Sequence, residues 1–121
     1  MRDVRRPIDP NSTRFLDQLK MHIRSRNLSY NTEKVYVQWV LRFIRYHFKR
    51  HPIEMAEKEV ETFLNYLANQ RRTSKSTQRV ALNAIIYLYR EFLKIELSDL
   101  SFSVASKPRK TNDSMPERPL A

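Results

Sequence analysis

Apolar side chains recur every three or four positions in four stretches of the chain, which is the spacing of one face of an α-helix. The stretches cover about residues 13–26, 29–49, 56–70 and 74–94, and Pro52 marks the break after the second. The pattern predicts four amphipathic helices around one core. Their inward positions are expected to be Phe15, Leu16, Leu19 and Ile23; Tyr36, Trp39, Val40, Phe43, Ile44 and His47; Val60, Phe63, Leu64, Leu67 and Ala68; and Ala81, Leu82, Ile85, Leu88, Tyr89 and Phe92.

The regions outside these helices differ from them in composition. Residues 1–12 contain two prolines and no periodicity, which indicates a flexible basic arm. A fifth, short helical turn at 97–102 is expected to close the bundle, and the polar, proline-punctuated residues 107–121 are typical of a linker or disordered tail. The chain contains no glycine, which further favours helices over hairpins. The prediction is an all-α bundle of four to five helices at 13–106.

The charge of the chain is strongly positive. It contains 23 lysines and arginines against 13 acidic residues, a formal net charge of +10. Such a balance favours a polyanionic partner, namely nucleic acid, an anionic membrane or an acidic protein surface. A membrane is the weakest of these, because no apolar run approaches the ~20 residues that cross a bilayer and the basic helix faces have no bulky apolar edge. The absence of cysteine excludes disulfides and thiolate metal sites, and a reducing compartment fits.

The outward faces of the second and fourth helices are basic. Rotation by about 100° per residue places one polar stripe opposite Tyr36 and Val40, and another opposite Ile85. The first stripe contains Lys34, Gln38, Arg45 and Lys49, with Arg42 beside it, and the second contains Ser76, Arg79, Asn83, Tyr87, Arg90 and Lys94. Near the starts of the two helices stand Asn31, Thr32, Lys75 and Thr77. Helix N-termini attract phosphate, cations release counterions, and amides reach base edges or phosphate oxygens, so we predict that these residues contact DNA.

A plainer interpretation exists for each residue taken singly. A charged helix face is usually solvated, and a serine or threonine before a helix is usually a cap. DNA contact is favoured over this plainer interpretation because two helices show the same pattern and the acidic residues are concentrated elsewhere in the chain. Glu54, Glu57, Glu59 and Glu61 stand around the start of the third helix, where they favour the positive end of its dipole. That helix is therefore expected to face solvent or another protein rather than DNA.

No catalytic or metal site is predicted. His47 and His51 have the spacing of a helical metal pair, but no further ligands are spaced to complete a zinc shell, and His47 lies on the apolar stripe. Tyr36 and Tyr89 fall on core faces, and Tyr66 within an ordinary helix. No Ser/His/Asp arrangement or glycine-rich phosphate loop is present. We expect no enzymatic activity, no cofactor and no small-molecule ligand.

A family resemblance rests on residues of the second to fourth helices. The opening of the core-binding domain of tyrosine recombinases resembles Leu28-Ser29-Tyr30-Asn31-Thr32-Glu33-Lys34-Val35-Tyr36 followed by Trp39 and Arg42-Phe43. The integron integrase branch in particular resembles His47-Phe48-Lys49-Arg50-His51-Pro52-Ile53-Glu54-Met55, Glu59-Val60-Glu61-Thr62-Phe63-Leu64, Ser76-Thr77-Gln78 with Ala81-Leu82, and Leu88-Tyr89-Arg90-Glu91. The likeness covers about residues 14–110. Phe48 stands where related sequences often have glycine.

The resemblance implies a helical, SAM-like domain whose second and fourth helices lie against recombination-site DNA, either duplex or folded single strand. It implies that catalysis belongs to a C-terminal domain that this chain does not contain, with residues 107–110 similar to the linker between the two. It also implies a bacterial, cytoplasmic, nucleoid-associated protein. The sequence after Lys110 does not resemble entry into a catalytic domain. The alternative function is a protein-interaction bundle that associates with itself or with recombinase partners without touching DNA.

Overall fold

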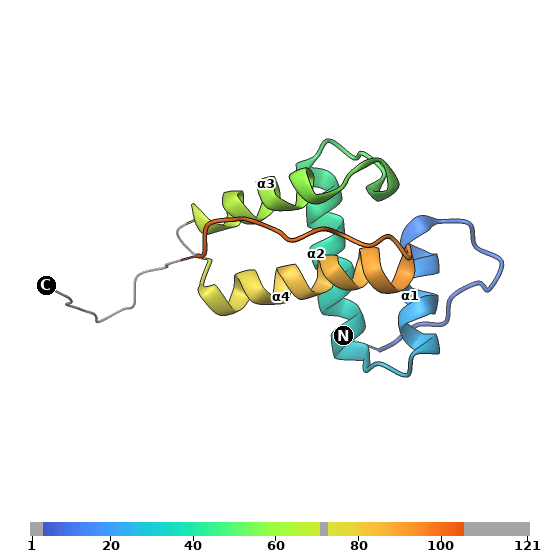
Figure 1. The fold of residues 1–121 in the computed structure, drawn as a ribbon. Coiled ribbons are helices and arrows are strands. Elements are labelled where there is room, and N and C mark those ends of the chain that lie inside the picture. Colours follow the sequence, from blue (N-terminus) through green and yellow to red (C-terminus); the bar gives the residue numbers. More distant parts are fainter. Residues whose placement is uncertain (1–3, 71–72, 106–121) are drawn as a thin grey trace, which may run out of the picture.

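The computed structural model describes residues 4–70 and 73–105, and these contain helices and connecting segments but no strand (Figure 1). The α-helices are α1 (Phe15–Ser25), α2 (Tyr30–Tyr46), α3 (Glu57–Ala68) and α4 (Lys75–Ile86). A short 3-10 turn η1 (Pro52–Glu54) precedes α3, and a π-helical segment η2 (Tyr87–Phe92) continues α4. The predicted all-α class is confirmed. The first three predicted helices are present with slightly shorter bounds, whereas the fourth, expected to reach about residue 94, is α-helical only to Ile86 and π-helical from Tyr87 to Phe92.

The two helices with basic faces begin with the same cap. The side-chain oxygen of Ser29 accepts a hydrogen bond from the backbone N–H of Thr32 at 3.1 Å, and that of Ser74 accepts one from Thr77 at 3.1 Å. A serine at this position binds one of the N–H groups that the first turn of a helix leaves without a partner. Both helix starts are therefore defined by local sequence.

The core forms where α2 meets α1, α3 and α4. α2 crosses α4 near the middle of the molecule (Figure 1), and Ala81 and Ala84 of α4 are completely buried, so small side chains allow the two backbones to approach. Pro52 and Met55, between α2 and α3, are buried but were not predicted to be. Within α1–α4 and η2, the large apolar side chains that are completely buried, or nearly so, are Leu19, Ile23, Val40, Phe43, Val60, Phe63, Leu64, Leu67, Ile85, Leu88 and Tyr89. All of them are inward positions of the predicted stripes.

The chain closes its helices without glycine. Left-handed φ angles are found at Asn27 (60°) after α1, at Phe48 (61°) and Lys49 (65°) after α2, and at Lys94 (58°) after η2. After α2 the backbone N–H of Lys49 bonds to the carbonyl of Ile44 at 2.8 Å, a reversal that most often uses glycine. Residues with a Cβ thus occupy positions that a Cβ disfavours.

The predicted fifth helical turn at 97–102 is wrong. Residues 94–105 form no helix and run as an extended segment between α3 and α4 (Figure 1). We call residues 95–105 the strap. Its backbone N–H groups bond to a row of side chains on one face of α3: Ser98 to Glu57 (2.5 Å), Ser101 to Glu61 (2.7 Å) and Ser103 to Asn65 (2.6 Å). The extended conformation gains these long-range bonds, which a helical turn would lose.

A buried glutamine of α4 fixes the end of the strap. Gln78 is 3% exposed, and its side-chain nitrogen donates to the carbonyls of Leu64 (3.0 Å) and Ser103 (2.8 Å). Its side-chain oxygen accepts from the N–H of Ala105 at 2.9 Å. Two of the acidic residues expected to face solvent or another protein, Glu57 and Glu61 of α3, instead bond to the chain's own strap. The predicted tail at 107–121 lies outside the described residues.

Candidate nucleic-acid interface

The polar stripe predicted on α2 is present at the surface. Its described members are all exposed and run along the helix into the turn that follows it: Asn31, Lys34, Gln38, Arg42, Arg45 and Lys49. Thr32, in contrast, is half-buried and serves the cap with Ser29. We call the exposed set the α2 face. It contains four cations and no acid.

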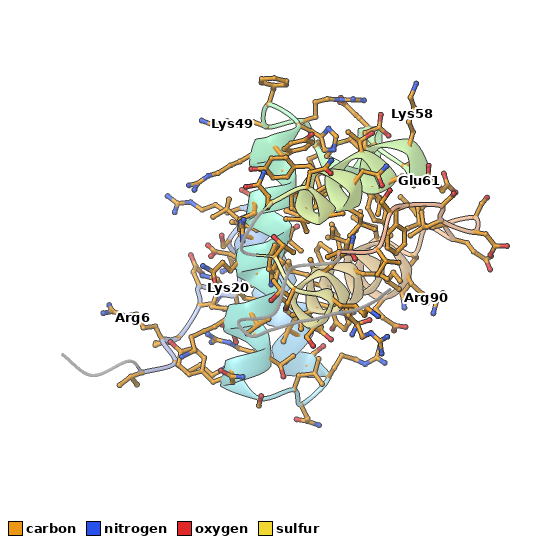
Figure 2. All side chains as sticks on the ribbon, turned by 90° about the vertical axis from the view of Figure 1, so that its left-hand side faces the viewer. Arg6, Lys20, Lys49, Lys58, Glu61 and Arg90 are labelled. Carbon is orange, nitrogen blue, oxygen red and sulfur yellow. The ribbon has the colours of Figure 1, made fainter. Side chains whose placement is uncertain are left out.

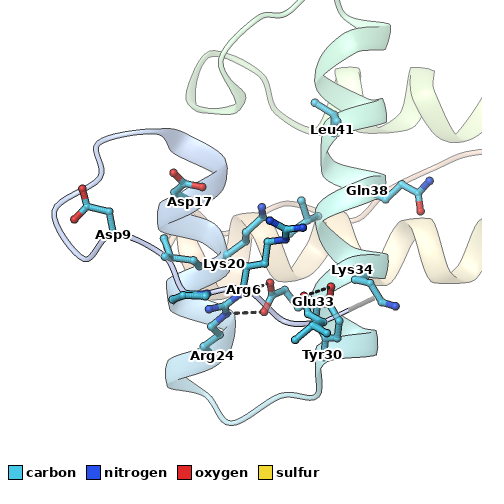
Figure 3. A pocket seen from close by; sticks show the side chains of 14 residues that line it. Arg6, Asp9, Asp17, Lys20, Arg24, Tyr30, Glu33, Lys34, Gln38 and Leu41 are labelled. Carbon is cyan, nitrogen blue, oxygen red and sulfur yellow. Dashed lines mark hydrogen bonds and ion pairs between the residues drawn. The ribbon is translucent and has the colours of Figure 1, made fainter. Parts of the chain in front are cut away.

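The only acidic residue of α2 is removed from this face. Glu33 is 3% exposed and accepts hydrogen bonds from Arg24 at 2.8 and 3.0 Å (Figure 3). It also accepts one from Arg5 at 2.8 Å. Burial opposes ionisation of Glu33, but the two guanidinium groups outweigh it and hold the pKa of that carboxyl below its usual range. The carboxylate thus stays ionised, and the two partly buried guanidinium contacts balance its negative charge inside the protein.

Aromatic rings support two of the cations on the α2 face. The guanidinium carbon of Arg42 lies 4.4 Å from the centre of the Trp39 ring, and the side-chain nitrogen of Lys34 lies 4.7 Å from the centre of the Tyr30 ring. These distances are typical of cation–π contacts. They limit the positions that both charged groups adopt at the surface.

The N-terminal half of α4 presents a second basic surface. Lys75, Ser76, Arg79 and Asn83 are exposed, and α4 contains no acidic residue. We call these four residues the α4 face. Thr77 is half-buried and, like Thr32, belongs to a serine cap, so for these two threonines the structure supports the plainer interpretation.

Tyr87 and Arg90 of the predicted fourth-helix stripe do not join the α4 face. The expectation that Tyr87 points outward is wrong: it is half-buried, its ring packs on Tyr36, and its hydroxyl lies 2.9 Å from Nδ1 of His22. Arg90 is exposed, but it lies beyond α4 on the side away from α2, beside the strap (Figure 2). The predicted stripe assumed a rotation of about 100° per residue along the whole helix. That assumption does not hold beyond Ile86, because the helix becomes π-helical at Tyr87 and because α1 packs against η2.

The helices that carry the two faces contact each other where they cross. α1 lies on one side of α2, and the N-terminal half of α4 extends on the other (Figure 1). Lys34 and Gln38 project from α2 on the side away from α1 (Figure 3), which is the side to which α4 extends. Phe102 and Val104 of the strap line a pocket together with Lys75 and Arg79, so the strap lies beside the α4 face, whose four residues remain exposed.

The N-terminal arm contributes residues that the sequence pattern missed. Arg5, expected to be part of a free basic arm, is half-buried in its ion pair with Glu33. Arg6 remains exposed and lines a groove between the arm, α1 and α2, together with Lys20 (Figure 3). No sequence signal indicated that Arg5 and Arg24 share one carboxylate, because the three residues are distant in sequence.

The histidines have structural partners. Nε2 of His47 lies 2.8 Å from the carbonyl of Glu59, and Nδ1 of His51 accepts the N–H of Ile53 at 3.1 Å. Within the described residues no group of three His, Cys, Asp or Glu side chains is arranged to hold a metal ion. In the same part of the chain no helix combines the length and the apolar character needed to span a bilayer.

Comparisons with known proteins identify the family of this domain. A family model described as phage integrase, N-terminal SAM-like domain, matches residues 15–99. The chain belongs to this family. Two of its relatives, each named "Integrase/recombinase", come from Escherichia coli and Pseudomonas aeruginosa; each is 44% identical over 98 residues, which is 80% of this chain. The matched region spans 29% of the length of these relatives. The resemblance to the N-terminal domain of tyrosine recombinases is thereby confirmed.

Proposed function

We propose that this SAM-like domain binds recombination-site DNA through the α2 and α4 faces, as the DNA-gripping part of a tyrosine recombinase of the integron integrase type. One observation carries the proposal. Of the two crossing helices, one has no acidic residue and the other buries its single carboxylate between two arginines. Together the faces present the cations Lys34, Arg42, Arg45, Lys49, Lys75 and Arg79.

The chemistry of these residues fits a phosphate backbone. Each cation that meets a phosphate releases condensed counterions, so affinity falls steeply with salt. The first N–H groups of α2 and α4 add the positive ends of two helix dipoles. Gln38 and Asn83 supply amides that read base edges or bind phosphate oxygens. In this proposal Thr32 and Thr77 order the helix starts, and Tyr87 and Arg90 make no contact.

In this proposal the domain binds DNA and does not catalyse recombination. In the proposal, cutting and rejoining of strands are carried out by parts of the relatives that this chain does not span. The domain then needs no cofactor and no small-molecule ligand, and it acts at DNA in the bacterial cytoplasm. Contacts between copies are expected only within an assembly on DNA.

The proposal is tested by fluorescence anisotropy with a labelled recombination-site duplex between about 50 and 200 mM salt. Arg45→Ala and Arg79→Ala should each weaken binding. Each should also lower the magnitude of the slope of log affinity against log salt by about 0.9, the contribution of one phosphate contact. Lys58→Ala is the matched control, because Lys58 is exposed on α3, away from both faces (Figure 2). No binding at the lowest salt, together with self-association that is the same with and without DNA, would instead support the protein-interaction bundle.

A further inference from the structure

The turn after α2 holds a phenylalanine in an unfavourable position. Phe48 is 92% exposed, whereas the other five phenylalanines are buried or half-buried. Its φ of 61° lies in the left-handed region, where glycine is preferred because a Cβ crowds the backbone. Both features oppose folding, and no packing within the described residues offsets them.

Cationic residues stand close to Phe48 in the sequence. Lys49 follows it directly in the turn and is exposed, also with a left-handed φ, and Arg45 lies one turn earlier on α2 and is exposed. Arg50 is engaged by Glu59 at 3.3 Å and by the carbonyl of Glu54 at 2.8 Å. Figure 2 shows Lys49 projecting from the end of α2, so the turn continues the α2 face.

We propose that Phe48 stacks on a nucleobase of bound DNA, with Arg45 and Lys49 on the flanking phosphates. An aromatic ring between cations matches a base between phosphates, and stacking tolerates any base because each has a π-face. The base is either unpaired or part of a duplex step that the ring enters as a wedge. This inference rests on the proposed function and adds to it a contact with a base.

The left-handed turn supports the same assignment. A sharp reversal at the helix end directs the ring away from the domain rather than back onto α2. Backbone strain that the fold itself does not require is often retained at binding sites. If Phe48 serves binding and not folding, its removal should stabilise the domain and weaken DNA binding at the same time.

The experiment compares Phe48→Gly and Phe48→Trp with Ile53→Ala, which removes another exposed apolar side chain of the same region. Three DNAs of one sequence carry 2-aminopurine: a paired duplex, a duplex with that base unpaired, and a single strand. We expect Phe48→Gly to melt at a higher temperature and to bind at least one DNA about tenfold more weakly or worse, in the range of a lost stacking contact. Phe48→Trp should keep the affinity of the parent and the quenching of 2-aminopurine fluorescence that stacking causes. Ile53→Ala should bind like the parent.

The pattern across the three DNAs identifies the source of the base. Loss on the paired duplex indicates a wedge, and loss only on the other two indicates an unpaired base. Phe48→Gly that binds all three DNAs like the parent overturns the stacking role while the proposed function stands. Equal losses in Phe48→Gly and Ile53→Ala, or loss of self-association with DNA affinity intact, also overturn it. If the parent binds none of the DNAs, the proposed function itself fails.

Discussion

Arg24 holds both carboxylate oxygens of Glu33, with its Nε at 2.8 Å from one and its Nη2 at 3.0 Å from the other. Arg5 of the arm bonds to the same carboxylate at 2.8 Å and to the carbonyl of Leu28 at 3.3 Å. One buried acid therefore joins α1, α2 and the arm. The same arrangement keeps negative charge off the α2 face, so it links the stability of the domain to its proposed binding surface.

The first prediction concerns this carboxylate. Glu33→Gln should lower the free energy of unfolding at pH 7 by about 2–3 kcal/mol, because two partly buried guanidiniums lose their counter-charge. The folded-state pKa of Glu33 is lowered, so its contribution is present above the ordinary value of 4.5 and is lost as the pH falls through the folded pKa. Urea denaturation at pH 7 and below pH 4 should show a difference between parent and variant that shrinks with acid. A difference independent of pH would contradict this account.

The second prediction concerns the anchor of the strap. Gln78→Leu should lower the free energy of unfolding by about 2–3 kcal/mol, because the buried carbonyl of Leu64 and the groups of Ser103 and Ala105 lose their partners. Hydrogen exchange should show faster exchange of the strap amides, with the α1 amides affected less. Gln70→Leu, at an exposed position after α3, is the control and should change neither quantity. Unaltered exchange in the strap would show that Gln78 does not hold it.

The third prediction concerns His22. Its pKa is lowered by burial and by the nearby positive charges of Arg26 and Lys94, so the neutral ring is favoured beside the Tyr87 hydroxyl. Below its ordinary pKa of 6.5 the unfolded chain binds the proton more readily than the folded domain. The melting temperature of the parent should therefore fall between pH 7.5 and pH 5.5. His22→Gln should reduce that fall and His51→Gln, at an exposed ring, should not; equal falls in all three proteins would refute the assignment.

The helices and most of the core could be predicted from sequence because burial repeats at helical spacing. Leu19, Val40, Phe63 and Ile85 were all assigned inward, and all are buried. The strap could not be predicted, because its hydrogen bonds join Ser98 to Glu57, far away in the chain. Local sequence contains no sign of that pairing.

The candidate site was predictable only in part, for two physical reasons. Exposure of Lys34, Gln38, Arg45 and Arg79 follows from the helical period, and the structure bears it out, although their contact with DNA stays a prediction. The placement of Tyr87 depends on a change to π-helical geometry, which a wheel of constant pitch does not contain.

The central claim is that the two basic faces bind one DNA molecule together, and the salt dependence of binding tests it most directly. The measurement is the slope of log affinity against log salt for the parent, for Arg45→Ala with Arg79→Ala, and for Lys58→Ala. The account predicts that the double variant loses about 1.8 from the magnitude of the slope, about 0.9 for each phosphate, while Lys58→Ala keeps the parent slope. A double variant with the parent slope, or one that changes no more than Lys58→Ala, would contradict it.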